Sequence, residues 1–173
     1  MIRPTLNTEI YAEIHPDNFK DQFKDKLVIV TGAARGIGRH ISLAFAKAGA
    51  TLALLDFDVE RQSETKSLCE AEGAKVYVFG CDVTKYVQCC KAVEEVDKLG
   101  SIDVLVNNAG GGPIRGFVGQ KFEEFWAGIE QNFKGVDSLN PCLIIGNDYD
   151  ASCASRDEGT AEGMYHQHCV EVA

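Results

Sequence analysis

The stretch Leu27–Gly38, LVIVTGAARGIG, decides the fold. Its first residues, Leu27–Thr31, form the continuous apolar run expected of a strand buried on both faces of a sheet. Gly32, Gly36 and Gly38 follow in a Gly-x-x-x-Gly-x-Gly spacing, which differs from the common Gly-x-Gly-x-x-Gly fingerprint. Such a turn lets the backbone approach phosphates closely, and the helix that it opens offers free N–H groups to an anion. The stretch therefore predicts a binding site for the pyrophosphate of a dinucleotide.

Strand and helix patterns alternate from this stretch onward. The predicted elements are strands at 27–31, 51–55, 75–80 and 102–106, and helices at 36–48, 58–72, 84–99 and 121–134. Asp58 and Thr84 are interpreted as the caps of the second and third helices. The alternation predicts an α/β protein with right-handed crossovers, built as a Rossmann-type doubly wound parallel sheet with helices on both faces.

Composition divides the chain into three parts. We expect residues 1–25 to form an irregular arm, residues 26–136 a dinucleotide-binding domain, and residues 137–173 a divergent tail of loop or disorder. The tail holds seven acidic residues and one basic residue, although a short strand at 142–145 fits its apolar residues. We therefore expect a sheet that is truncated after the helix at 121–134 and followed by an irregular acidic tail.

The overall composition argues against several classes of protein. Hydrophobic residues make up 45% and charged residues 25%, as in ordinary soluble domains. The net charge of −9 argues against a nucleic-acid partner. We expect no membrane partner and a cytoplasmic location, because apolar runs of spanning length and a signal peptide are both missing. The seven cysteines are interpreted as reduced packing thiols. No metal site is expected, although His166, His168 and Cys169 leave that alternative open.

Candidate site residues follow four successive strands. After the glycine turn come Asp56, the pair Asp82–Val83 and the run Asn107–Gly110. Ligands of parallel sheets bind outside the carboxyl ends of the strands, so these residues are expected to lie together. Their convergence supports a nucleotide site more strongly than any one motif does.

Asp56 and Arg35 favour different cofactors. A carboxylate at Asp56 can accept the hydroxyls of an adenosine ribose and repel a 2′-phosphate, whereas a guanidinium at Arg35 could hold that phosphate. Asp82 and Val83 could bind and flank the adenine, although Asp82 could also be a simple turn residue. Asn107–Gly110 could likewise be a plain turn after a strand. We predict NAD as the cofactor, with NADP less favoured.

These motifs resemble those of the classical short-chain dehydrogenase/reductase family over about residues 20–136. The family's glycine turn matches Thr31–Gly38, its NNAG motif matches Asn107–Gly110, and its N-x-x-G setting matches Asn132–Gly135. The resemblance implies an NAD(P)-dependent oxidoreductase that transfers hydride between nicotinamide and an alcohol or carbonyl. It assigns a catalytic role to Asn132 and cofactor binding to Gly32, Arg35, Gly36, Ile37, Gly38, Asp56, Asp82, Val83, Asn108, Ala109 and Gly110.

The resemblance does not extend to the family's other catalytic residues. The family uses a tyrosine as proton donor, a lysine four residues later that lowers its pKa, and an upstream serine that orients the substrate. None of the five tyrosines here is followed by lysine at that distance, where the chain has His15, Cys81, Cys90, Cys153 and Cys169. We therefore expect negligible turnover, and a small alcohol or carbonyl substrate only where the missing half is supplied.

Three interpretations stay open at this point. The chain is an oxidoreductase by ancestry, a non-catalytic dinucleotide-binding module, or a shortened product of splicing, a frameshift or a mistaken gene model. The family also pairs through helices equivalent to 84–99 and 121–135, which implies a homo-oligomer. An apolar stripe in the last helix fits either a core face or such a pairing surface, and it comprises Phe122, Phe125, Trp126, Ile129 and Phe133.

Overall fold

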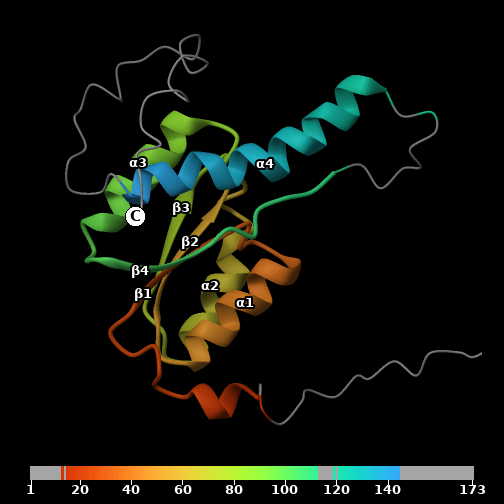
Figure 1. The fold of residues 1–173 in the computed structure, drawn as a ribbon. Helices are drawn as coiled ribbons and strands as arrows, with labels where there is room; N and C mark the ends of the chain where they lie inside the picture. The colour runs from red at the N-terminus through yellow and green to blue at the C-terminus, as the bar shows by residue number, and fades with distance from the viewer. Residues whose placement is uncertain (1–12, 14, 113–118, 120, 145–173) are drawn as a thin grey trace, which may run out of the picture.

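A single parallel sheet forms the centre of the molecule (Figure 1). The computed structural model describes residues 13, 15–112, 119 and 121–144. Its strands are β1 (Leu27–Thr31), β2 (Thr51–Asp56), β3 (Val76–Gly80) and β4 (Ile102–Val106), in the order β3-β2-β1-β4. Every pairing is parallel, with Leu27 opposite Thr51 and Ile102 on its two sides. The predicted parallel sheet is confirmed.

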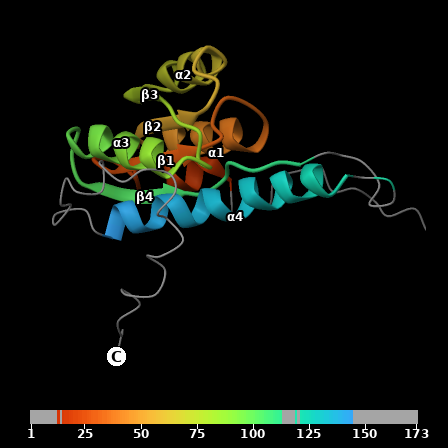
Figure 2. The ribbon, with the colours of Figure 1, turned by 90° about the horizontal axis from the view of Figure 1, so that it is seen from above.

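Helices cover both faces of the sheet, as the view from above shows (Figure 2). The helices α1 (Gly36–Lys47) and α2 (Gln62–Ala71) lie on one face, and α3 (Tyr86–Asp97) and α4 (Phe122–Ile144) lie on the other. Alternate residues of β1 therefore enter different cores. Leu27 and Ile29 pack on the side of α3, while Val28 and Val30 pack on the side of α1. This double burial explains the continuous apolar run in the sequence and confirms a doubly wound, Rossmann-type sheet.

The cysteines of the described residues pack in these cores, as predicted. Cys69 is a residue of α2 that faces one core, while Cys89 and Cys90 on α3 and Cys81 just after β3 face the other; all four are buried thiols. Burial raises the pKa of the Cys69 thiol to about 11, helped by the carboxylates of Glu72 and Glu70. Its thiol is therefore protonated near neutral pH and behaves as a small apolar side chain.

Helix α4 is longer than the sequence pattern predicts. A helix was expected at 121–134 with loop beyond 136, whereas α4 continues to Ile144 and passes through the expected domain boundary. Leu139 is fully buried in the core that it shares with α3, so packing sustains the helix beyond the change in composition. The expected strand at 142–145 is wrong over 142–144, and residue 145 lies outside the described residues. Neither α4 nor any shorter helix in the described part of the chain is long and apolar enough to cross a membrane.

Two helices begin later than their predicted caps. Asp58 was expected to cap a helix running to residue 72, but its Oδ1 accepts the N–H of Arg61 in a turn, and α2 starts at Gln62. Thr84 was expected to cap the third helix. Its hydroxyl donates instead to Asp82 Oδ1 at 2.7 Å, and α3 starts at Tyr86 without a side-chain cap. Both side chains stabilise the preceding loop rather than a helix end.

The segment before β1 has more structure than the expected irregular arm, within the residues described there. A short 3-10 helix, η2, spans Pro16–Phe19. Further on, the N–H of Phe23 donates to the carbonyl of Ala48, and the Phe23 ring meets Phe45 edge-on with centroids 4.9 Å apart. These contacts join the segment to the carboxyl end of α1.

A salt bridge fixes the end of the sheet that lies opposite the strand carboxyl ends. Asp103 accepts the Lys26 ammonium at 2.7 Å and the N–H of Leu27 at 2.9 Å, and these two donors lower the pKa of Asp103. A lowered carboxyl pKa adds stability above the unfolded value of about 3.9, and that stability is lost as the pH falls through the folded value. Asp103→Asn is expected to lower the unfolding midpoint at pH 7 and to flatten its acid dependence.

Thermal unfolding from pH 7 down to pH 2 measures this effect, with Asp97→Asn on the exposed end of α3 as the matched control. Only the Asp103 variant should approach the wild type as the pH falls. Parallel acid profiles for the variant and the wild type would show that Asp103 contributes no linked stability.

Candidate functional site

The predicted site residues meet at the carboxyl ends of the strands. The N–H of Ala34, in the glycine turn after β1, donates to Asp56 Oδ2 at 3.0 Å, at the end of β2. The N–H of Cys81, just after β3, donates to the carbonyl of Asp56 at 3.0 Å. The side-chain nitrogen of Asn108, after β4, donates to the carbonyl of Thr31 at 2.8 Å. Hydrogen bonds thus connect all four strand ends into one site.

Three glycines shape the turn that leads into α1. Gly32 and Gly36 have φ values of 65° and 57°, the left-handed region that favours glycine. Gly38 is needed for a different reason: a Cβ there would lie 2.2 Å from the carbonyl oxygen of Gly32. Helix α1 therefore packs directly on the turn, and the three residues Arg35, Gly36 and Ile37 at its start are exposed. This open start can present its N–H groups to an anion.

The loop after β4 is clamped to the glycine turn. Thr31 Oγ1 accepts the N–H groups of Asn108 and Ala109 at 3.0 and 2.9 Å, and its hydroxyl lies 3.2 Å from the carbonyl of Val106. Asn108 Nδ2 also lies 3.3 Å from the carbonyl of Gly32. Thr31 was noted as the start of the glycine motif but was not predicted as a site residue. Its position at the last residue of β1, next to the turn, was the available signal.

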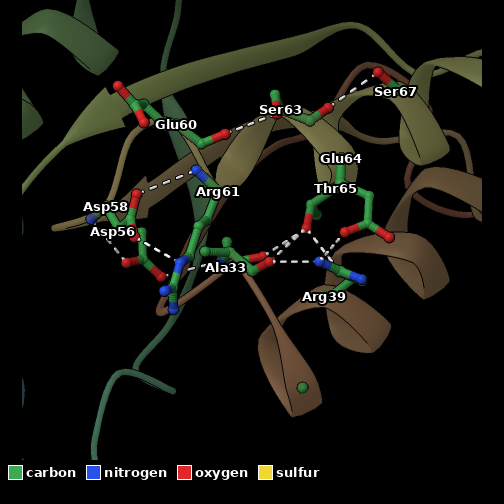
Figure 3. A network of polar contacts seen from close by, with 12 residues as sticks. Ala33, Arg39, Asp56, Asp58, Glu60, Arg61, Ser63, Glu64, Thr65 and Ser67 are labelled. Carbon is green, nitrogen blue, oxygen red and sulfur yellow. Dashed lines mark hydrogen bonds and ion pairs between the residues drawn. The ribbon is translucent and has the colours of Figure 1, made fainter.

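A polar network on the other side of the turn holds its carbonyl groups (Figure 3). Thr65, on α2, donates its hydroxyl to the carbonyl of Ala33 at 2.9 Å. Arg39 donates to Thr65 Oγ1 at 3.1 Å, to the carbonyl of Ala34 at 2.9 Å and to Glu64 at 2.8 Å. With these carbonyls held against α2, the turn has a fixed shape before any ligand binds. This network was not predicted from the sequence, where the only local signal was the positive charge of Arg39 immediately after Gly38.

Asp56 is buried, with 8% of its surface exposed, and its carboxylate is oriented by backbone groups. Oδ2 accepts from Ala34, and Oδ1 accepts the N–H of Asp58 at 3.1 Å. A carboxylate has about four acceptor positions, so two remain for a ligand with paired hydroxyl groups. The structure therefore places Asp56 as the sequence suggested, and its contact with a ribose stays a prediction.

Asp82 and Val83 take part in local structure after β3. Asp82 Oδ1 accepts the N–H and the hydroxyl of Thr84 at 3.0 and 2.7 Å, which is the turn role that the sequence left open. The Val83 side chain is buried against α4, where a Cβ on Gly135 would lie 2.9 Å from it. Their role at an adenine ring stays a prediction, and any such contact from Val83 would come chiefly from its backbone.

Asn132 holds the glycine loop that follows β4. Its side-chain nitrogen donates to the carbonyls of Gly111 and Gly128, both at 2.6 Å. A Cβ on Gly110 would lie 2.5 Å from Asn132 Oδ1, so the loop and α4 are in direct contact. The structure brings Asn132 to the end of β4, and its catalytic role stays a prediction.

The apolar stripe of α4 is exposed rather than buried. The fractions of surface exposed are 69% for Phe122, 38% for Phe125, 49% for Trp126, 39% for Ile129 and 75% for Phe133. In Figure 1 the first half of α4 extends past the sheet. The core interpretation of the stripe is therefore wrong, and the pairing interpretation stays a prediction.

A doubly wound parallel sheet with a glycine turn between β1 and α1 defines a Rossmann-type fold, the class of fold in which many proteins bind dinucleotides. Beyond this class, the chain matches the family model described as short chain dehydrogenase over residues 26–140. The chain therefore belongs to the short-chain dehydrogenase family.

Individual relatives support the same assignment. General stress protein 39 of Bacillus subtilis (strain 168) is 45% identical over 111 residues, which cover 63% of this chain and 39% of that protein. Epidermal retinol dehydrogenase 2 of Mus musculus is 31% identical over 140 residues, covering 78% of this chain and 45% of the relative. The crystal structure of an NAD⁺-bound xylitol dehydrogenase has a TM-score of 0.68 and 28% identity, with coverage of 74% of this chain and 51% of that one. The chain thus spans about half the length of these relatives, or less.

Proposed function

We propose that this chain binds NAD at the carboxyl ends of its strands and uses NADP less readily. The orientation of Asp56 carries this proposal, because two backbone N–H groups aim a buried carboxylate and leave acceptor positions for ribose hydroxyls. The glycine packing supports it, since α1 approaches the turn at Gly38 and opens with exposed residues. An NAD⁺-bound dehydrogenase among the structural relatives is consistent with the same cofactor.

The residues present fit the parts of a dinucleotide. The N–H groups at the start of α1 would hold the pyrophosphate, and Asp56 would accept the adenosine ribose hydroxyls. Asp82 and the backbone of Val83 would meet the adenine, while Asn108–Gly110 would allow close approach at the end of β4. When bound, the cofactor supplies a nicotinamide ring that can accept or release hydride. The clamp between Thr31 and Asn108 would hold the loop after β4 in place at the end of the site that receives this ring.

The proposal includes negligible hydride transfer by a polypeptide of these 173 residues. Reduction of a carbonyl requires a proton donor at the developing alkoxide. Asn132 is the one catalytic residue of the family that the sequence matches, and its amide nitrogen already donates to the carbonyl of Gly111 in the loop after β4 and to that of Gly128 on α4. None of the chain's tyrosines is followed by lysine after four residues. An alcohol or carbonyl substrate would be used only where another polypeptide segment supplied the missing proton donor.

Asp56→Ala is the variant that tests cofactor binding. Loss of a charge-assisted acceptor is expected to weaken NAD binding roughly 10- to 100-fold, since hydrogen bonds to charged groups contribute about 1.5–3 kcal/mol. Isothermal titration calorimetry of the wild type and the variant with NAD⁺ measures the change. Asp97→Ala removes the same side chain from the exposed end of α3 and serves as the matched control, with affinity expected to stay within twofold.

Two results would contradict the proposal. A wild-type protein that is folded by circular dichroism but gives no heat with millimolar NAD⁺ would remove cofactor binding. Oxidation or reduction of a panel of alcohols and carbonyls by the same preparation, at rates ordinary for an enzyme, would remove the non-catalytic part alone.

A further inference from the structure

Three cysteines lie together where the chain passes from β3 to α3. Cys81 follows β3 directly, and Cys89 and Cys90 are residues of α3. The Sγ atoms of Cys81 and Cys89 are 3.9 Å apart, so the two thiols are in direct contact. The sulfur atoms of a disulfide are about 2.05 Å apart, so this pair needs to approach by only about 2 Å to form one.

The first turn of α3 also holds the loop that follows β3. Cys89 Sγ lies 3.5 Å from the carbonyl oxygen of Val83 and 4.0 Å from that of Asp82, so its thiol can donate to both. The neighbouring Gln88 accepts the N–H of Asp82 at 2.9 Å through its Oε1. The Cys89 thiol therefore helps to position the loop that is proposed to meet the adenine.

Cys81 is suited to react first with an oxidant. Its side-chain hydrogen bond with Cys89 lowers the pKa of the Cys81 thiol and outweighs burial and the nearby Asp82 and Cys90, which raise it. The thiolate is the nucleophilic form of cysteine, so a lowered pKa favours attack on an oxidant. Cys69 differs in this respect, because burial raises its pKa to about 11.

The start of α3 gives an oxidant a route to the pair. Both side chains are buried, with 2% of Cys81 and none of Cys89 exposed, so the oxidant must be small. Helix α3 begins at Tyr86 without a side-chain cap, and Lys85 immediately before it is exposed. Helix ends open locally more readily than helix centres, and Cys89 lies in the first turn. Hydrogen peroxide, which is small and uncharged, fits this route.

We propose that Cys81 and Cys89 are a modification site, where hydrogen peroxide forms a reversible disulfide. The Cys81 thiolate attacks one peroxide oxygen, the O–O bond breaks, and Cys81 becomes a sulfenic acid while hydroxide leaves and takes up the proton that Cys81 released. The Cys89 sulfur then attacks the Cys81 sulfur, the S–O bond breaks, and the hydroxyl group leaves as water with the Cys89 proton. The thiol pair thus loses two electrons and two protons, and the peroxide becomes two molecules of water.

The disulfide is expected to weaken NAD binding, and this effect alone rests on the proposed function. Oxidation removes the Cys89 S–H, so the carbonyls of Asp82 and Val83 lose a donor. The approach of the two sulfur atoms also draws the residue after β3 toward α3. The loop between them must therefore shift at the proposed adenine position, and reduction by a dithiol reverses the change.

Peptide mapping after peroxide treatment tests the modification site. Cleavage after lysine places Cys81 in peptide 76–85 and both Cys89 and Cys90 in peptide 86–91. The treated wild type, with its remaining thiols alkylated, is expected to give these two peptides joined and lighter by two hydrogens than their sum. Dithiothreitol should separate them. Cys81→Ser and Cys89→Ser should lose the joined product, whereas the matched control Cys90→Ser should keep it.

Calorimetry with NAD⁺ tests the effect on the proposed site. The oxidised wild type is expected to bind roughly fivefold more weakly than the reduced protein, because hydrogen bonds that hold the loop are lost. Cys81→Ser should bind equally before and after peroxide treatment. Circular dichroism of each preparation verifies that a change in affinity does not come from unfolding.

The outcomes separate the disulfide from the proposed function. The proposal is overturned if peptide 76–85 stays unlinked in the treated wild type, or if the new bond joins Cys89 to Cys90 within peptide 86–91. Equal NAD⁺ affinities of the oxidised and reduced forms overturn the effect on the site, while the proposed function stands. A folded, reduced wild type that binds no NAD⁺ contradicts the proposed function and this effect together, whereas a joined peptide still establishes the disulfide.

Discussion

Replacing Gly38 with alanine is expected to cost about 1–3 kcal/mol of unfolding free energy and to remove detectable NAD binding. The added Cβ would lie 2.2 Å from the carbonyl oxygen of Gly32 and 2.6 Å from Asn108 Nδ2. Both neighbours belong to the clamp that joins the turn to the loop after β4, and the nearer one is a backbone atom that cannot rotate away. Helix α1 must therefore move off the turn, taking its N–H groups away from the proposed pyrophosphate position.

Gly112→Ala is the matched control for this variant. Gly112 lies in the loop after β4, its φ is outside the left-handed region, and a Cβ there would meet no heavy atom of the described residues within 4 Å. Urea unfolding and calorimetry with NAD⁺ on both variants measure stability and binding together. A Gly38 variant that matched the wild type in both measurements would show that α1 does not need its close approach to the turn.

The strands could be predicted from the sequence almost to the residue. β1 and β4 have the predicted limits, β2 ends one residue later at Asp56, and β3 begins one residue later at Val76. The reason is double burial, since both faces of β1 and β2 enter apolar cores and each strand reads as an uninterrupted apolar run. Helix limits were predicted less well because they depend on which partner a polar side chain finds. Asp58 and Thr84 form hydrogen bonds within the loops that precede the helices, and the local sequence does not specify these partners.

The candidate site was predictable where its residues are set by the ends of the strands. Asp56 and Asn108 occupy the expected positions, and each contacts the glycine turn. The supporting residues Arg39 and Thr65 were missed, because they lie 26 positions apart and meet only when α1 and α2 pack side by side. The ion pair between Arg61 and Asp58 was also missed, because Asp58 was interpreted as the cap of the second helix.

The change in composition after residue 136 is a poor guide to where the packed domain ends. It reflects acidic and polar residues, whereas packing depends on single side chains at helical spacing. Leu139 lies in the core with Val93 and Val96 of α3, three positions beyond the expected boundary. Asn140 also reaches back into the site region, where its Oδ1 accepts from Asn107 Nδ2 at 3.0 Å. Residues just beyond the boundary therefore belong to the same folded unit as the proposed dinucleotide site.

Leu139→Ala measures how much the part of α4 beyond residue 136 contributes to the free energy of unfolding. Leu139 has none of its surface exposed, and truncating a fully buried leucine to alanine costs about 2–5 kcal/mol. Domains of this kind have a total stability of about 5–15 kcal/mol, so the variant is expected to lose a large share of it. Val136→Ala is the matched control, because Val136 lies one turn earlier on α4 and is 39% exposed; its cost should stay below about 1 kcal/mol. Equal urea midpoints for the Leu139 variant and the wild type would mean that the folded unit ends before residue 139.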